Sequence, residues 1–308
     1  MQANQWLTLL QSKLPHLNFL EGELLSKHTY FRIGGPARIF CAVDRRNDLE
    51  LLAKIAYENI IPFHVFGGAS NVLIRDEGVD ALVILNKTKE LLVEESADDV
   101  RFIADSGLPV NILVKSTIDH SATGMQCFLG LPGTVGGAVV NNSHFTSTQL
   151  FGNFIEYVDV VTPAGTQRFF QKDLEFAYDY SRFHHERAVV LRASFRVLKG
   201  NLEEIRAESL QYVQKRNATQ PIGLPSSGCI FRNALVADKK VFAGKLIDDA
   251  GLKGTRVGGA EVSEVHANFI VNRGGASSHD VLELAELVQK KVKDKTGVVL
   301  EKEIFIIP

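Results

Sequence analysis

The chain has 308 residues, and 34 Lys and Arg residues against 36 Asp and Glu residues leave a formal net charge of −2. This balance excludes the strongly basic field that drives non-specific binding to nucleic acids. A hydrophobic content of 45% excludes a largely disordered chain, and no apolar run approaches the roughly 18 residues of a membrane-spanning helix. We therefore expect no nucleic-acid or membrane partner, and the length predicts two or three domains.

Three cysteines, Cys41, Cys127 and Cys229, are an odd number and lack the spacing of a metal site. The N-terminal residues also lack the charged-then-apolar order of a signal peptide. Together these features predict a cytoplasmic globular enzyme whose cysteines are reduced and which holds no structural metal.

In the first half of the chain, short apolar runs alternate with helical patterns. The helical spacing of Trp6, Leu10 and Leu14 predicts an amphipathic helix at the start. This half is expected to contain strands at 39–43, 61–66, 72–74, 82–85 and 100–104, and helices at 48–57 and 112–117. The order predicts a strand–helix–strand unit joined to meandering strands.

In the second half, three predicted strands precede a change in composition, and we place a domain boundary there, at about residue 199. The strands, at 157–161, 167–170 and 189–197, carry consecutive apolar residues, as is typical of strands covered on both faces. The last part is expected to contain helices at 202–216, 245–250 and 280–295 and strands at 230–232, 268–271 and 300–307. Ser277 or Ser278 is expected to cap the last helix and Gly297 to end it.

Residues 67–71, Gly-Gly-Ala-Ser-Asn, form a predicted turn between two strands. Glycine permits positive φ and close backbone approach, so successive N–H groups can converge on an anion. The turn is not a dinucleotide-binding fingerprint, because that motif opens a helix and here a strand follows. A tight hairpin is the alternative interpretation.

A second glycine-rich run covers residues 130–142, with four glycines at 130, 133, 136 and 137. So many positions without a side chain cost conformational entropy, and a large flat ligand lying on the backbone would explain them. Close strand packing at a bulge is the structural alternative. Two such turns predict a cofactor with a pyrophosphate and a ring system.

Six segments resemble, in family order, the UDP-N-acetylenolpyruvoylglucosamine reductases, and they lie at residues 29–38, 67–71, 130–142, 227–233, 243–254 and 298–304. The resemblance runs from about residue 20 to the C-terminus. It implies an α+β protein with a two-lobed FAD-binding domain of the vanillyl-alcohol-oxidase-like (PCMH) type and a smaller α+β substrate domain. The implied parts are two lobes at 1–86 and 87–198, a substrate domain at 199–297, and a C-terminal strand at 298–308 that returns to the flavin. The short loop after residue 197 resembles the type II form.

The resemblance implies a bacterial enzyme that makes a peptidoglycan precursor, with FAD as cofactor and NADPH as reductant. Its substrate is a small UDP-sugar, UDP-N-acetylglucosamine enolpyruvate, which is reduced to UDP-N-acetylmuramate, and we expect a monomer. Hydride passes from NADPH to the flavin and then to the alkene, so the reaction needs an acid, a partner for the developing enolate and a group that tunes the flavin. The alternatives are a flavin oxidase of the same fold acting on another sugar or alcohol, and a non-catalytic UDP-sugar-binding flavoprotein.

Cys229 stands where the family has a serine or cysteine acid. A thiol is mostly protonated at neutral pH and is a stronger acid than a hydroxyl; a buried, inert cysteine is the alternative, with Ser227 as the fallback acid. Glu303 matches the family's catalytic glutamate. Glu301 shares its face of an alternating strand and is the other candidate.

The third catalytic position departs from the family pattern, Tyr-Arg-x-Ser, because this chain has Asp179 at the arginine position, and an acid there would oppose a developing anion. Arg182, three residues further on, is the nearest replacement. A related departure is His144, in an Asn-Ser-His sequence where the family more often has Asn-Ala-Gly.

For the cofactor, the resemblance implies contacts with Arg32, Gly67, Gly68, Ala69, Ser70, Asn71, Gly130, Pro132, Gly133, Thr134, Gly136, Gly137 and Asn141. For the substrate, it implies hydrogen bonds from Gln220 and Asn233 to diphosphate or sugar. His266 aligns with a substrate-contacting amide position, although a lone histidine among apolar residues is also typical of a core residue. No metal is expected.

Overall fold

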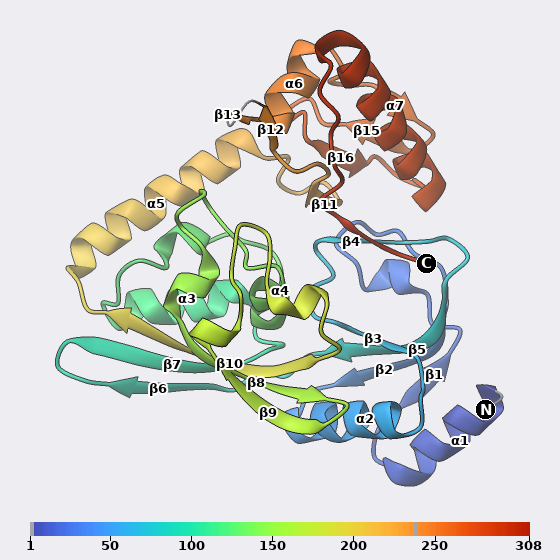
Figure 1. Cartoon of the computed structure of the whole chain (residues 1–308), viewed down its shortest axis with the longest axis vertical. Helices are drawn as coiled ribbons and strands as arrows, with labels where there is room; N and C mark the ends of the chain where they lie inside the picture. Colours follow the sequence, from blue (N-terminus) through green and yellow to red (C-terminus); the bar gives the residue numbers. More distant parts are fainter. Residues whose placement is uncertain (1–2, 237–238) are drawn as a thin grey trace. The chain divides into compact units, whose positions relative to one another are not determined.

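The computed structural model describes residues 3–236 and 239–308, and the chain forms two compact units (Figure 1). The first unit combines Met1–Glu21, Ile39–Gly68 and Ala81–Arg216. The second combines Gly22–Arg38, Ala69–Asp80 and Asn217–Pro308. Neither unit is continuous in the sequence, and the turn at residues 67–71 is one of the places where the chain passes from one to the other.

This division differs from the predicted boundary at residue 199. Helix α5 (Leu202–Thr219) places Ile205 in the core of the first unit, so the division falls after Arg216 rather than before the helix. Residues 22–38 and 69–80, expected in the first FAD-binding lobe, belong instead to the second unit. Long-range strand pairing and packing, which composition does not report, cause both differences.

A five-stranded antiparallel sheet, in the order β6-β7-β10-β8-β9, forms the centre of the first unit (Figure 1). Its strands are β6 (Leu91–Glu95), β7 (Asp99–Asp105), β8 (Ile155–Thr162), β9 (Gly165–Phe170) and β10 (Val189–Leu198). Helices α3 (Val110–Asp119) and α4 (Val135–Val140) cover one face, and α2 (Arg46–Glu58) packs on the other. The predicted strands β7 to β10 are confirmed, whereas β6, which is mostly exposed, was not predicted.

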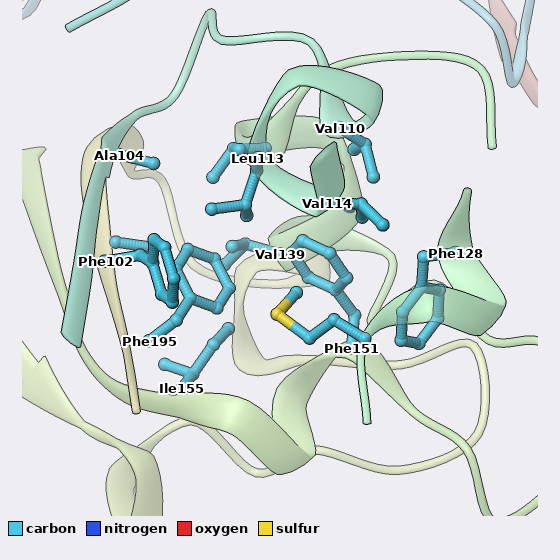
Figure 2. Close-up of a cluster of buried hydrophobic side chains, with 14 of the residues drawn as sticks. Phe102, Ala104, Val110, Leu113, Val114, Phe128, Val139, Phe151, Ile155 and Phe195 are labelled. Atoms are coloured by element: carbon cyan, nitrogen blue, oxygen red, sulfur yellow. The ribbon is translucent and has the colours of Figure 1, made fainter. Parts of the chain in front are cut away.

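The core beneath α3 and α4 is rich in aromatic rings (Figure 2). Phe151 makes edge-to-face contacts with Phe128 and Phe195, at ring-centroid distances of 5.3 and 5.2 Å. Such pairs add to the burial of large apolar side chains. The glycine-rich segment that leads into α4 is therefore anchored on a closely packed core.

A second sheet of the first unit has the order β1-β2-β5-β3, and helix α2 connects β2 to β3. Its strands are β1 (Phe19–Glu21), β2 (Ala37–Val43), β3 (Phe63–Phe66) and β5 (Val79–Asn86), with α1 (Ala3–Lys13) before them. β3 pairs with β5 in parallel, and β2 and β3, the two strands of the predicted strand–helix–strand unit, lie on either side of β5. The buried face of α2 shares one apolar cluster with this sheet and with β8 and β10.

The second unit contains a four-stranded sheet, β11-β16-β15-β14, and helices α6 (Ala243–Asp249) and α7 (Ser278–Thr296). The strands of this unit are β4 (Val72–Ile74), β11 (Ser226–Cys229), β12 (Ala234–Val236), β13 (Lys239–Val241), β14 (Arg256–Val257), β15 (Ala260–Val262), β16 (Phe269–Asn272) and β17 (Phe305–Ile307). The predicted caps of α7 are confirmed: the Ser277 side chain accepts the Asp280 N–H, and Gly297 ends the helix at φ +75°. Within the described residues, no helix is both long and apolar enough to cross a membrane.

Candidate functional site

The two glycine-rich segments meet inside the first unit. Strand β3 ends at Phe66, and a Cβ atom added to Gly67 would lie 2.0 Å from the Thr134 Oγ1 atom. Thr134 is the residue that precedes α4. The backbone at the start of the first turn therefore packs against the Thr134 side chain of the second segment, although more than sixty positions separate them.

Within the second segment, the glycines serve different purposes. Gly130 and Gly133 have left-handed φ angles of +85° and +106°, which glycine adopts at little cost. Gly136 packs on Ser106, and its N–H donates to the Ser106 carbonyl at 2.7 Å. Gly137 is exposed, and the nearest atom to its added Cβ is 4.0 Å away. Close packing thus explains Gly136 but not Gly137, whose open backbone suits a flat ligand such as a flavin.

In the second unit, the segment at residues 29–38 lies beside the other half of the first turn. The Tyr30 N–H donates to the Ala69 carbonyl at 3.4 Å. Arg32 and Ala69 are not glycines, yet both have left-handed backbones, at φ +56° and +47°. Strained positions of this kind cluster at ligand sites, and the Arg32 side chain is exposed.

Cys229 and Glu303 come together on adjacent segments of the second unit. Cys229 ends β11, after a bulge at Gly228 with φ +81°. The Glu303 N–H donates to the carbonyl of Ile230 at 2.8 Å. The regular closing strand is shorter than predicted and covers only Phe305–Ile307, whose Phe305 N–H donates to the Asn71 carbonyl. The C-terminal segment therefore contacts both the Cys229 segment and the end of the first glycine turn.

Burial separates the candidate acids. Ser227 is 2% exposed, and its Oγ has no hydrogen-bond partner among the described residues, whereas Cys229 is partly exposed. Burial raises the pKa of both the Cys41 and the Cys127 thiol to about 12. Those two cysteines behave as core residues, so Cys229 is the thiol available for chemistry.

Asn233 and His266 meet at the start of α6. The Asn233 Oδ1 atom accepts the Ala243 N–H at 3.1 Å, and a Cβ on Gly244 would lie 3.2 Å from the His266 ring. Burial lowers the pKa of His266, whose Nδ1 accepts the Asn268 N–H, so the neutral ring carries its proton on Nε2. Gln220 follows α5 and is partly buried.

Arg182 is held within its own segment of the first unit. Its Nε donates to Glu186 at 2.6 Å, and its Nη1 donates to the Asp173 carbonyl at 2.7 Å. The guanidinium also lies 4.1 Å from the centroid of the Phe169 ring. These contacts use the guanidinium to hold residues 169–186 together.

The two departures from the family pattern contact each other. The Asp179 Oδ1 atom lies 2.7 Å from the His144 Nδ1 atom, and the Tyr178 hydroxyl lies 2.9 Å from His144 Nε2. No role was predicted for His144 from the sequence. The occurrence of both departures in the same chain could have indicated from the sequence that His144 and Asp179 are in contact.

Comparison with known proteins agrees with this geometry. Residues 37–170 match the model of an FAD binding domain, and residues 220–307 match the C-terminal domain of UDP-N-acetylenolpyruvoylglucosamine reductase. The fold and site therefore define a flavoprotein with the predicted α+β, PCMH-type FAD-binding fold, followed by a smaller C-terminal domain.

Proteins called UDP-N-acetylenolpyruvoylglucosamine reductase are similar to nearly the whole chain. The one from Chlamydia felis is 38% identical over 97% of this chain and 98% of its own, and the one from Syntrophobacter fumaroxidans is 37% identical over 96% and 85%. The solved structure of the reductase (MurB) from Thermus caldophilus has a TM-score of 0.77 at 30% identity, covering 95% of this chain and 99% of that one. The chain belongs to the UDP-N-acetylenolpyruvoylglucosamine reductase family.

Proposed function

We propose that this protein reduces UDP-N-acetylglucosamine enolpyruvate to UDP-N-acetylmuramate, with FAD as cofactor and NADPH as reductant, in the synthesis of peptidoglycan precursors. The observation that supports it best is the pairing of the Cys229 and Glu303 segments, in which the Glu303 N–H donates to the Ile230 carbonyl at 2.8 Å. FAD, when bound, accepts hydride from NADPH and delivers hydride to the alkene.

The FAD site is assigned to the backbone around both glycine turns and to Arg32. Glycines 67, 68, 136 and 137 allow a flat ring or a pyrophosphate to approach the backbone N–H groups. Gly137 is the most informative position, because the packing of the fold does not require a glycine there.

Cys229 is assigned as the acid, and its Sγ–H supplies the proton to the alkene carbon next to the ether oxygen. Glu303 lies on the neighbouring segment, where its carboxyl group would face the same reacting atoms. Asn233, His266 and Gln220 are assigned to the UDP-sugar. Arg182 has a positioning role, because its contacts hold residues 169–186 in place.

The test is an anaerobic visible spectrum of the purified protein, before and after NADPH, and then with the enol ether added. Bleaching by NADPH followed by recovery on adding the enol ether is expected. Bleaching without recovery would overturn the function in favour of another acceptor, and protein that holds flavin but never bleaches would be a binding module. Recovery with oxygen alone at full speed would identify an oxidase.

We further propose that the protein acts in the cytoplasm as a monomer. Its three cysteines carry no disulfide, as is usual in a reducing compartment. Light scattering coupled to size-exclusion chromatography should give a mass near 34.0 kDa; a mass of twice that value would contradict a monomer.

A further inference from the structure

The residues that follow Cys229 are held by hydrogen bonds on two sides. β11 ends at Cys229, which pairs with Phe269 at the start of β16. The Ile230 N–H donates to the Asn268 carbonyl at 2.8 Å, and the Ile230 carbonyl accepts the Glu303 N–H at 2.8 Å. The backbone next to the candidate acid therefore lies between the Asn268 segment and the C-terminal segment.

The side chain of Asn268 extends this pairing by one residue. Its Oδ1 atom accepts the Phe231 N–H at 3.0 Å, and its Nδ2 atom donates to the Phe231 carbonyl at 2.8 Å. Two backbones that face each other in an antiparallel sheet exchange hydrogen bonds in the same way. Only one orientation of the amide fits, because the Phe231 N–H needs an acceptor and the Phe231 carbonyl needs a donor.

This pair of hydrogen bonds is buried. Asn268 is 4% exposed and Phe231 is 1% exposed. A buried peptide group that loses its hydrogen-bond partner is destabilised, so the two bonds strongly favour one position of the Phe231 backbone. Because both polar atoms of its side chain are bonded to Phe231, we expect Asn268 to act through that backbone rather than by contact with the substrate.

Asn268 is also bonded to His266, a residue assigned to the UDP-sugar. The Asn268 N–H donates to the His266 Nδ1 atom at 3.2 Å. A histidine ring that accepts at Nδ1 carries its proton on Nε2 and can donate from that atom. A single residue therefore joins the candidate substrate histidine to the segment that carries the candidate acid.

We propose that Asn268 is a positioning residue for the proton transfer: its pairing with Phe231 fixes the position of the Cys229 thiol relative to the Glu303 segment. All of these residues belong to the second unit. This inference rests on the proposed function, which gives Cys229 and Glu303 their roles. Asn268 touches no reacting atom, and no covalent bond forms or breaks in it.

The kinetic test uses two variants in anaerobic rapid mixing. Asn268→Asp keeps the shape but sets a carboxylate oxygen against the Phe231 carbonyl, and Asn268→Ala removes both bonds. Each should slow flavin reoxidation at saturating enol ether by about 10- to 100-fold, the cost of misplacing a reacting group by about 1 Å. Reoxidation within twofold of the parent in both variants would overturn the proposal.

The same experiments separate positioning from binding. Both variants keep the backbone N–H that holds His266, so the enol ether concentration that gives half the maximal rate should stay close to that of the parent. FAD content and the rate of flavin reduction by NADPH should also be unchanged, because Cys229 and Glu303 take no part in that step. A weaker half-saturation with an unchanged maximal rate would make Asn268 a binding residue and contradict the proposal.

Ser277→Ala is the matched control for stability. It removes the cap of α7 in the same unit, so it should lower Tm without slowing reoxidation. If Ser277→Ala slows reoxidation as much as Asn268→Asp, lost stability alone explains the effect, and the positioning role is wrong.

A second readout needs no substrate. Iodoacetamide should alkylate Cys229, which is partly exposed, at least about threefold faster in Asn268→Asp than in the parent, because its segment opens more often. The rate in Ser277→Ala should equal that of the parent. An unchanged rate in both Asn268 variants would overturn this proposal even if the parent turns over. A parent whose flavin never recovers with the enol ether would overturn the proposed function instead.

Discussion

The backbone N–H of Glu303 donates a 2.8 Å hydrogen bond to the carbonyl of Ile230, the residue that follows Cys229. The predicted acid, Cys229, and the predicted glutamate, Glu303, are 74 positions apart in the sequence, yet they lie on paired segments. The pairing therefore brings the Cys229 and Glu303 segments together within the second unit.

Cys229→Ala should lower turnover by roughly 10²- to 10⁴-fold, the usual contribution of a general acid. Cys229→Ser should retain much of the activity, because a hydroxyl can also donate a proton. The rate of flavin reoxidation by the enol ether measures both variants. An unimpaired Cys229→Ala enzyme would remove Cys229 from the mechanism.

Only Cys229 should react with a thiol reagent in the native protein at neutral pH. Burial raises the pKa of Cys41 and of Cys127 to about 12, so both remain protonated thiols, and the thiolate is the reactive form. Titration with a chromogenic disulfide should count one thiol in the folded protein and three after denaturation. A native count of three at the same rate would contradict this prediction.

Gly67→Ala and Gly137→Ala form a matched pair that separates folding from cofactor binding. The first change forces a Cβ against Thr134, and overpacking of this kind costs about 1–3 kcal/mol of unfolding free energy. In Gly137→Ala the added methyl group has open space around it on α4. The free energy of unfolding of the cofactor-free variant should therefore equal that of the parent or exceed it by up to about 1 kcal/mol. FAD affinity should fall in both variants. Full FAD affinity in Gly137→Ala would place the flavin elsewhere.

Glu261 should make stability depend on pH in the acid range. It is 1% exposed, and hydrogen bonds from Arg273 above all, and from Arg256, hold its pKa below the ordinary value of 4.5. Because the folded pKa is lowered, the contribution is complete above that ordinary value and is lost as pH falls through the folded pKa. Glu261→Gln should therefore cost about 1–3 kcal/mol at pH 7, and the difference from the parent should shrink below pH 4. Chemical denaturation of Glu261→Gln and of the parent, at pH 7 and below pH 4, measures this difference in the free energy of unfolding. An equal difference at the two pH values would contradict the role given to the Glu261 carboxylate.

Arg182→Ala should lower Tm, because it removes the contacts with Glu186 and the Asp173 carbonyl. Its effect on flavin reoxidation by the enol ether should be smaller than that of Cys229→Ala. Differential scanning calorimetry and rapid mixing on the same samples give both quantities. The opposite order of kinetic effects would restore Arg182 as the group that replaces the family arginine.

Local patterns were sufficient for most elements, for the family and for its cofactor. The capping residues of α7 and the apolar runs of β8 and β10 predict those elements directly, because their causes lie within a few residues. The motif around Cys229 likewise identifies a family and a cofactor. These features depend on short-range preferences and on residue identity, which the sequence states explicitly.

Only the tertiary structure decided which distant residues act together. It grouped residues 22–38 and 69–80 with the C-terminal unit, set Gly67 against Thr134, and tied Arg182 to its own segment. It also placed His144 next to Asp179, the two positions at which the sequence departs from the family pattern. The reason is physical: a side chain's charge and hydrogen bonds depend on neighbours within a few ångströms, and long-range strand pairing, not sequence spacing, determines those neighbours.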